Sequence, residues 1–304
     1  QVWGPTTREE SVRAVQRALD LGINYFDVAP AYGNGEAEVA MGIALEGRRE
    51  QAVVGTKVRV PIGDKPVLDT KEVANAVNQS VDISLRRLKM GYVDLLHLHN
   101  RFTPKRGEFQ DSVVTEDVLG PVLEAYRNVQ KAGKARFIGL SAHEPHVPSL
   151  RRMIESGHFD TVLIFYNLMN TTAHLAPPPG VDIFDHGQTI PLAKSLGMGV
   201  IGIRSHAAGA LTPQVDRAVE PGSELEADVR RAATLGFLLE EPIQTLSQAA
   251  MVFCLMNQDI DTTVPGVKNV PEIEEIAGCV DLPPISKRHL DRLSHIYSRD
   301  FCEE

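Results

Sequence analysis

Short apolar runs and longer amphipathic stretches alternate along the whole of this chain. Apolar runs bounded by turn residues are typical of buried strands, and apolar residues spaced by three or four positions are typical of helices. Regular alternation of the two indicates a parallel sheet connected by helices, so we expect an α/β fold. The expected strands cover residues 23–28, 52–58, 92–99, 136–140, 161–165, 199–203 and 262–264. The expected helices cover residues 8–21, 36–45, 70–89, 117–132, 147–156, 190–195 and 244–256.

The chain contains no fixed-period repeat, low-complexity tract or linker, which favours a single domain over residues 1–304. Thr7 and Glu10 have the spacing of a capping box at the start of the first helix, and Gly22 is expected to end it. Long loops are expected where Pro and Gly gather between the periodic segments, and in barrels such loops shape the substrate pocket. They are residues 101–118, 167–187 and 204–225.

Composition excludes several classes of function. Hydrophobic residues make up 43% of the 304 residues, enough to bury a large core. The formal net charge of −9, without a basic stripe, argues against a nucleic-acid partner. Three widely separated cysteines indicate neither a disulfide framework nor a zinc site, and no stretch reads as a membrane span or a signal peptide. We therefore expect a cytoplasmic protein that has no membrane partner.

Three of the expected strands end in titratable residues. Asp27 closes the first, with Tyr32 in the loop that follows, Lys57 closes the second and His99 closes the third. Taken singly, each has a simpler interpretation, such as a turn-forming Asp, a packed tyrosine or a core histidine. In barrels, however, the carboxyl ends of parallel strands carry the catalytic residues. The four residues together favour an active site, whereas His97, two positions earlier on the third strand, reads as a core residue.

These four residues, in this order, resemble the catalytic motif of the aldo-keto reductase superfamily. The resemblance extends through residues 131–141, 166–167 and 264–269, and covers roughly residues 8 to 280. It implies a (β/α)8 TIM barrel. Members of the family normally carry a short hairpin and a first strand before a segment like Trp3-Gly4, so the given chain is expected to lack both.

The resemblance implies reversible hydride transfer between a nicotinamide cofactor and a carbonyl compound or alcohol. Tyr32 would give a proton to the developing oxyanion. Lys57 would supply the positive charge that favours the phenolate, and Asp27 would hold that ammonium in place. His99 would donate to the substrate oxygen and orient it.

The same resemblance implies a set of cofactor contacts. Lys268 corresponds to a residue that approaches the 2′-phosphate of NADP(H), and Glu275 to one that meets adenine. Glu272 stands where many relatives have arginine or glutamine, so NADP(H) is expected while NAD(H) stays open. The residues expected at the cofactor are Ser141, Ala142, Arg204, Ser205, Gly266, Lys268, Glu272 and Glu275.

Three positions depart from the family pattern. Ala142 and Leu163 replace customary amide side chains, and Arg204 replaces an aromatic residue that often stacks on the nicotinamide. The planar guanidinium of Arg204 could stack in its place, or it could form a salt bridge at the barrel rim. The substrate is expected to meet Asn100, Arg101 and Phe102 at the mouth of the pocket.

Other functions stay open at this point. The fold could serve as a cofactor-binding regulatory subunit, as in potassium-channel β subunits, or Lys57 could form a Schiff base in an aldolase-like or phosphosugar enzyme. His143 and His146 could suggest a metal, but Pro145 disfavours a helical arrangement and no third ligand is evident. No metal is therefore expected. The expected partner is a small carbonyl or alcohol, bound by a monomer or small homo-oligomer.

Overall fold

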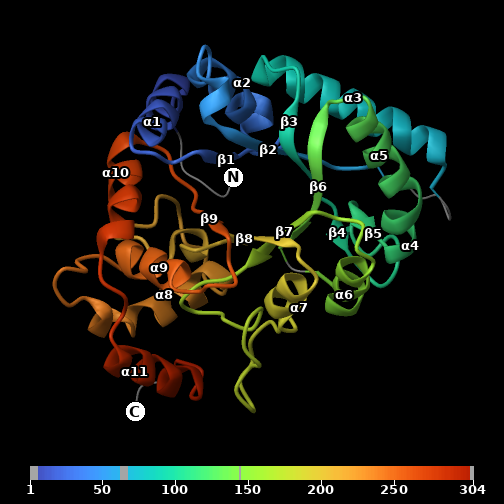
Figure 1. The fold of residues 1–304 in the computed structure, drawn as a ribbon. Helices are drawn as coiled ribbons and strands as arrows, with labels where there is room; N and C mark the ends of the chain where they lie inside the picture. Colours follow the sequence, from blue (N-terminus) through green and yellow to red (C-terminus); the bar gives the residue numbers. More distant parts are fainter. Residues whose placement is uncertain (1–5, 62–67, 144, 302–304) are drawn as a thin grey trace.

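Seven strands form one parallel sheet that curls into a nearly closed ring, with helices around its outside (Figure 1). The structure is a computed structural model that describes residues 6–61, 68–143 and 145–301. The strand order is β1, β2, β3, β6, β7, β8, β9, so β1 and β9 are the two edges. The strands are β1 (Tyr25–Asp27), β2 (Val53–Val58), β3 (Val93–Leu98), β6 (Ala135–Ala142), β7 (Thr161–Phe165), β8 (Gly199–Ile203) and β9 (Thr262–Val264).

The predicted α/β barrel is confirmed, and each of the seven expected strands is present. The prediction that a hairpin and a first strand are missing before Trp3 concerns a part of the chain outside the described residues. In the described part of the chain, no helix combines the length and the apolar character needed to cross a lipid bilayer.

The helices alternate with the strands, as expected. The predicted capping box is present, because Glu10 N–H donates to Thr7 Oγ1 at 3.1 Å and Thr7 N–H donates to Glu10 Oε2 at 3.1 Å. The helices are α1 (Arg8–Asp20), α2 (Glu36–Ala44), α3 (Thr70–Leu88), α4 (Thr115–Asp117), α5 (Leu123–Lys131), α6 (Val147–Glu155), α7 (Thr189–Ser195), α8 (Glu224–Ala233), α9 (Leu246–Leu255), α10 (Val270–Gly278) and α11 (Lys287–Tyr297).

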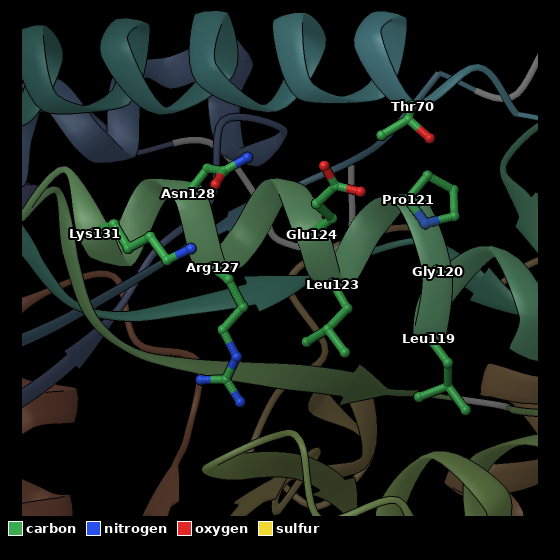
Figure 2. Close-up of a pocket in the computed structure, with 9 residues that line it drawn as sticks. All are labelled: Thr70, Leu119, Gly120, Pro121, Leu123, Glu124, Arg127, Asn128 and Lys131. Carbon is green, nitrogen blue, oxygen red and sulfur yellow. The ribbon is translucent and has the colours of Figure 1, made fainter.

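The helix expected over residues 117–132 is interrupted. Pro121 has no N–H to donate, and Gly120 has φ −104° and ψ −109°, so a wide turn over Val118–Val122 separates α4 from α5. A hollow of about 520 Å³ lies beside this turn, between α3 and α5 (Figure 2). It is lined by Thr70 and by residues of the 119–131 stretch, and it contains none of the expected site residues.

Two of the expected loops contain regular structure. The segment 101–118 forms two short paired strands, β4 (Arg101–Phe102) and β5 (Ser112–Val113), and the segment 204–225 runs into α8. Sequence signals for the unexpected helices α8 and α11 were available at their first turns. Ser223 and Ser286 cap them by accepting from the backbone N–H three residues later, which is the standard N-cap pattern.

The interior of the ring is closed below the site by close packing. His97 is fully buried, as expected of a core residue, and its Nε2 lies 3.0 Å from Thr161 Oγ1. Gly139 makes this contact possible, because a Cβ there would lie 2.4 Å from Thr161 Oγ1 and 2.6 Å from His97 Cδ2. Burial lowers the pKa of His97 well below its usual value, so the ring is neutral.

Candidate active site

The four expected catalytic residues meet at the carboxyl ends of β1, β2 and β3. Asp27 is the last residue of β1 and pairs in register with Gly55 of β2, two residues before Lys57. His99 directly follows β3, where its N–H donates to the Val58 carbonyl at 2.8 Å. Tyr32 begins the short turn Tyr32–Gly35 that follows β1. Parallel register therefore places residues from three strands at one edge of the sheet.

Lys57 and Asp27 form a buried ion pair, with only 2% and 8% of their side chains exposed. Lys57 Nζ contacts Asp27 Oδ2 and also donates to the Val28 carbonyl at 2.9 Å. Burial opposes the ammonium, but the Asp27 carboxylate and the Tyr32 hydroxyl outweigh it, so the pKa of Lys57 is raised. Burial also raises the pKa of Asp27, against the effect of the Lys57 ammonium. The lysine is thus held as a cation directly beneath the opening of the ring.

Tyr32 lies between this ion pair and His99. Lys57 Nζ is 4.8 Å from the centroid of the tyrosine ring, and the His99 ring is 6.1 Å away at an interplanar angle of 90°. Tyr32 itself is 41% exposed. The phenol therefore faces a cation on its buried side and solvent on its open side.

His99 is a neutral imidazole at physiological pH. Burial, together with Lys57 and Arg59, lowers its pKa to about 3. A neutral imidazole carries one N–H donor and one acceptor nitrogen. His99 can therefore donate a hydrogen bond without adding a second positive charge to the site.

The expected nicotinamide contacts lie at the same edge of the sheet, on β6 and after β8. Ser141 and Ala142 are the last two residues of β6 and are buried. Arg204 follows β8 with a positive φ of 62°, and its carbonyl accepts from Asn167 Nδ2 at 2.9 Å. The hydroxyl of Ser205 is fully buried and has no hydrogen-bond partner among the described residues.

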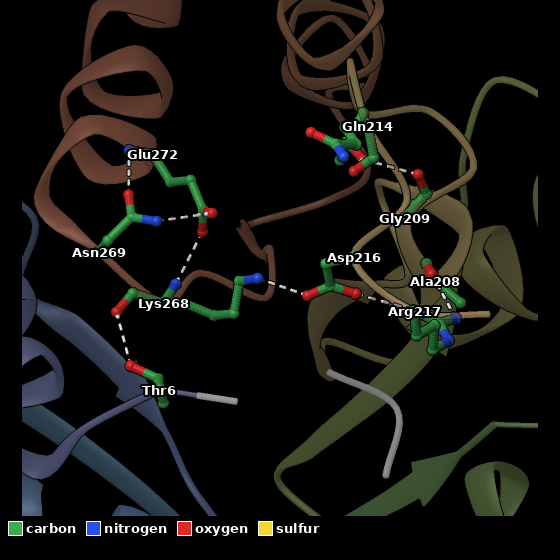
Figure 3. Close-up of polar contacts among 10 residues, drawn as sticks. Thr6, Ala208, Gly209, Gln214, Asp216, Arg217, Lys268, Asn269 and Glu272 are labelled. Atoms are coloured by element: carbon green, nitrogen blue, oxygen red, sulfur yellow. Dashed lines mark hydrogen bonds and ion pairs between the residues drawn. The ribbon is translucent and has the colours of Figure 1, made fainter. Parts of the chain in front are cut away.

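The start of α10 differs from an open anion site (Figure 3). The Glu272 carboxylate accepts from Lys268 N–H at 2.7 Å and from Asn269 Nδ2 at 2.9 Å. The Lys268 ammonium pairs with Asp216 from the loop after β8. The donors and the cation expected to meet a phosphate are thus engaged by two carboxylates of the chain itself.

Glu275 is fixed to the start of α9. Its two carboxylate oxygens accept from Thr245 Oγ1 at 2.5 Å and from Ser247 Oγ at 3.1 Å, and Ser247 Oγ also lies 3.3 Å from His206 Nε2. Gly266 lies between β9 and α10, in the connection that carries Lys268.

Of the residues expected to meet the substrate, Phe102 and Asn100 contact other parts of the protein. Phe102 is 2% exposed and packs in the core. The Asn100 amide is engaged by backbone, with its Oδ1 accepting from Val60 N–H at 2.8 Å and its Nδ2 donating to the carbonyls of Val60 and Asp111. Arg101 does line a hollow at this edge, together with Arg59, which the sequence reading missed. The sequence feature that points to Arg59 is its position two residues after Lys57, because Arg101 likewise stands two residues after His99.

His143 and His146 make contacts other than those of metal ligands. His146 Nδ1 lies 2.8 Å from Ser149 Oγ, and the ring of His143 packs edge-on against Phe165 at 6.1 Å. Within the described residues, no three His, Cys, Asp or Glu side chains gather as a metal site would require.

Comparison with known proteins gives a consistent result. L-galactose dehydrogenase of Arabidopsis thaliana is 29% identical over 285 residues, which cover 92% of this chain and 80% of that protein. The holo form of aldo-keto reductase AKR11C1 from Bacillus halodurans superposes with a TM-score of 0.72 at 21% identity, covering 96% of this chain and 89% of that one. An aldo/keto reductase from Klebsiella pneumoniae, solved with NADP and acetate, superposes with a TM-score of 0.67 at 19% identity, covering 96% and 86%.

The profile of the Aldo/keto reductase family matches residues 1–298, almost the whole sequence. A match of this extent includes all three strand ends that carry Asp27, Lys57 and His99. The chain therefore belongs to the aldo/keto reductase family.

Proposed function

We propose that this protein catalyses reversible hydride transfer between a nicotinamide cofactor and a small aldehyde, ketone or sugar, with Tyr32 as the proton donor. The observation that carries the proposal is the position of Tyr32, with the Lys57 ammonium 4.8 Å from its ring and the His99 ring 6.1 Å away. The family supports the class of reaction. Arabidopsis L-galactose dehydrogenase and the NADP-bound Klebsiella reductase are relatives whose names and ligands agree with it.

Each residue of the site has a distinct task. When bound, the cofactor supplies or accepts the hydride. Tyr32 gives its proton to the substrate oxygen as negative charge develops there. Lys57 stabilises the phenolate that remains, and Asp27 balances the charge of the ammonium inside the protein. His99, neutral at physiological pH, donates to the same oxygen and orients the carbonyl.

The residues around β6, β8 and α10 fit a dinucleotide. The buried hydroxyl of Ser205, which has no hydrogen-bond partner among the described residues, and the hydroxyl of Ser141 near the end of β6 would offer polar contacts to its nicotinamide half. Lys268 and the N–H groups at the start of α10 would meet the phosphates of its adenosine half in place of their present partners, Asp216 and Glu272. We propose NADP(H) as the preferred form, with NAD(H) accepted, and Glu272 as the residue that limits this preference.

Replacement of Glu272 by glutamine is expected to raise the preference for NADPH over NADH by about tenfold, or about 1.4 kcal/mol. The substitution keeps the side-chain length and removes the negative charge next to Lys268 N–H and Asn269. The ratio of the two dissociation constants, from fluorescence titration, measures the effect. Glu274→Gln is the matched control, because Glu274 lies on the same helix and pairs with Arg17 at 2.8 Å. An unchanged ratio in Glu272→Gln would place Glu272 away from the ribose.

A Schiff-base mechanism is disfavoured by the electrostatics of Lys57. A nucleophilic lysine must lose its proton, whereas the raised pKa of Lys57 keeps it protonated. Borohydride treatment in the presence of aldehyde should therefore leave Lys57 unmodified.

The proposed activity can be tested directly. We expect oxidation of NADPH, followed by its absorbance, when the protein is given a panel of aldehydes, ketones and aldoses. Oxidation of the corresponding alcohols with NADP should proceed in the reverse direction. Cofactor binding without turnover of any carbonyl or alcohol would contradict the enzymatic proposal and favour a regulatory subunit.

A further inference from the structure

A hollow of about 590 Å³ lies where the chain leaves β2 and β3 at their carboxyl ends. Its lining includes Arg59, Arg101, Phe109, Gln110 and Asp111. The two arginines lie close to proposed catalytic residues along the chain, since Arg59 is two residues after Lys57 and Arg101 is two residues after His99. Arg59 Nε also donates to the His99 carbonyl at 3.2 Å. Two of the residues that line the hollow therefore lie next to the strand ends that carry Lys57 and His99.

The charges in this hollow do not balance. Among the described residues of its lining, Asp111 is the one carboxylate and is shared by both arginines, which leaves one net positive charge among them. Both contacts are loose, with Asp111 oxygens 3.8 Å from Arg59 Nε and 3.7 Å from Arg101 Nε. More than half of each arginine side chain is exposed, at 53% and 57%. Most of the guanidinium N–H groups are therefore available to a ligand.

A second carboxylate shared by two arginines shows what a satisfied arrangement looks like in this protein. At the opposite end of the ring, Asp94 binds Arg49 and Arg136 at 2.8 Å each, and its side chain is 3% exposed. Asp111 is more exposed, at 22%, and is about 1 Å farther from its partners. The arrangement at Asp94 is complete, whereas the one at Asp111 leaves room for a second anion.

Arg101 is also held in a suitable orientation. Its guanidinium lies over the ring of Phe109, with the central carbon 4.4 Å from the ring centroid. Stacking covers the face of a guanidinium and leaves the N–H groups at its edge free to bind a carboxylate or phosphate in a bidentate manner. The Arg101 backbone is fixed as well, since its N–H donates to the Asp111 carbonyl at 3.2 Å.

We propose that this hollow binds the anionic end of the substrate, so that the protein prefers carbonyl compounds carrying a carboxylate or a phosphate. The inference rests on the proposed function and specifies its substrate class. The carbonyl lies at Tyr32 and His99, while the anion lies between the guanidinium groups of Arg59 and Arg101. Neutral aldehydes reach the same catalytic residues without this contact.

Matched pairs of substrates test the proposal. One pair is 4-carboxybenzaldehyde and 4-formylbenzamide, which differ in the charge of one group, and the other is glyceraldehyde 3-phosphate and glyceraldehyde. In the wild-type protein, kcat/KM should be about tenfold higher for the anionic member of at least one pair, as one charge-assisted contact supplies. The pair that shows the difference identifies carboxylate or phosphate as the preferred group.

Variants assign the effect to the hollow. Arg101→Gln and Arg59→Gln should each lower the ratio of kcat/KM for the anionic member to kcat/KM for the neutral member by about tenfold. Asp111→Asn should raise the same ratio, because it removes the carboxylate that competes for the two arginines. Arg288 is an exposed arginine on α11, and Arg288→Gln is the control that should leave this ratio unchanged.

The outcomes separate this inference from the function on which it rests. Turnover of neutral aldehydes with no preference for anions, or an anion preference that survives both arginine variants, overturns the inference and leaves the proposed function intact. Absence of turnover with every carbonyl overturns both.

Discussion

Replacing Tyr32 with phenylalanine is expected to lower kcat for carbonyl reduction by about 10²- to 10⁴-fold, the usual contribution of a positioned general acid. The substitution removes only the phenolic hydroxyl. The ring keeps its place above Lys57 and beside His99, and the proposed cofactor contacts, on β6, after β8 and near the start of α10, lie on other elements. Cofactor affinity should therefore stay unchanged while the chemical step is lost.

Steady-state kinetics and a fluorescence titration of NADPH separate the two quantities. Tyr92→Phe is the matched control, because Tyr92 precedes β3 at the opposite end of the ring, where its own aromatic face is covered by Arg49. It should change neither kcat nor affinity. Full activity in Tyr32→Phe would mean that another group gives the proton.

Replacing Lys57 with methionine is expected to abolish turnover and to lower the free energy of unfolding by about 3 to 5 kcal/mol. Methionine has similar bulk but no charge, so the Asp27 carboxylate would stay buried without its cation. Asp27→Asn combined with Lys57→Met removes both charges and should recover most of the lost stability, with no recovery of turnover. Urea unfolding and kcat measure the two effects.

The pH dependence gives a second test of the same variant. Without Lys57, the pKa of Asp27, already raised by burial, should rise further above its value in the unfolded chain. The folded state then binds a proton more tightly than the unfolded state, so the stability deficit of Lys57→Met shrinks as pH falls below that pKa. A deficit that is independent of pH, or a double variant as unstable as the single one, would contradict a buried charge as its cause.

The approach of Asp27, Lys57 and His99 to one another could be predicted from sequence because parallel register determines it. Once residues 23–28, 52–58 and 92–99 are neighbouring strands, Asp27, Lys57 and His99 must reach the same edge of the sheet. The capping box at Thr7 was equally readable, because its two partners are three residues apart. Local spacing and strand order carry this information.

Contacts between distant loops could not be predicted in the same way. The pairing of Lys268 with Asp216 joins segments 52 residues apart, and it depends on how the loop after β8 folds back. The engagement of Asn100 by Val60 and Asp111 likewise depends on the conformation of the segment after β3. A residue type at a strand end indicates that a group is available, but its partner depends on loop geometry.

The break that separates α4 from α5 illustrates a third limit of prediction from sequence. The apolar spacing over residues 117–132 continues through the break, and only Gly120 and Pro121 indicate it. Buried positions on both sides, such as Val118 and Val122, keep the helical period. Periodicity reports which face is buried and gives little information on whether the backbone is continuous.

The neutral His97 beneath Lys57 determines the direction from which the site is supplied with protons. His97 pairs in register with Lys57, and its depressed pKa prevents the ring from accepting a proton at physiological pH. Its Nε2 contacts Thr161 Oγ1, and the backbone at Gly139 packs closely against both side chains. On the proposed mechanism, each proton that leaves Tyr32 is therefore replaced from bulk solvent across the exposed side of the phenol, and the rate of reprotonation depends on what covers the mouth of the barrel.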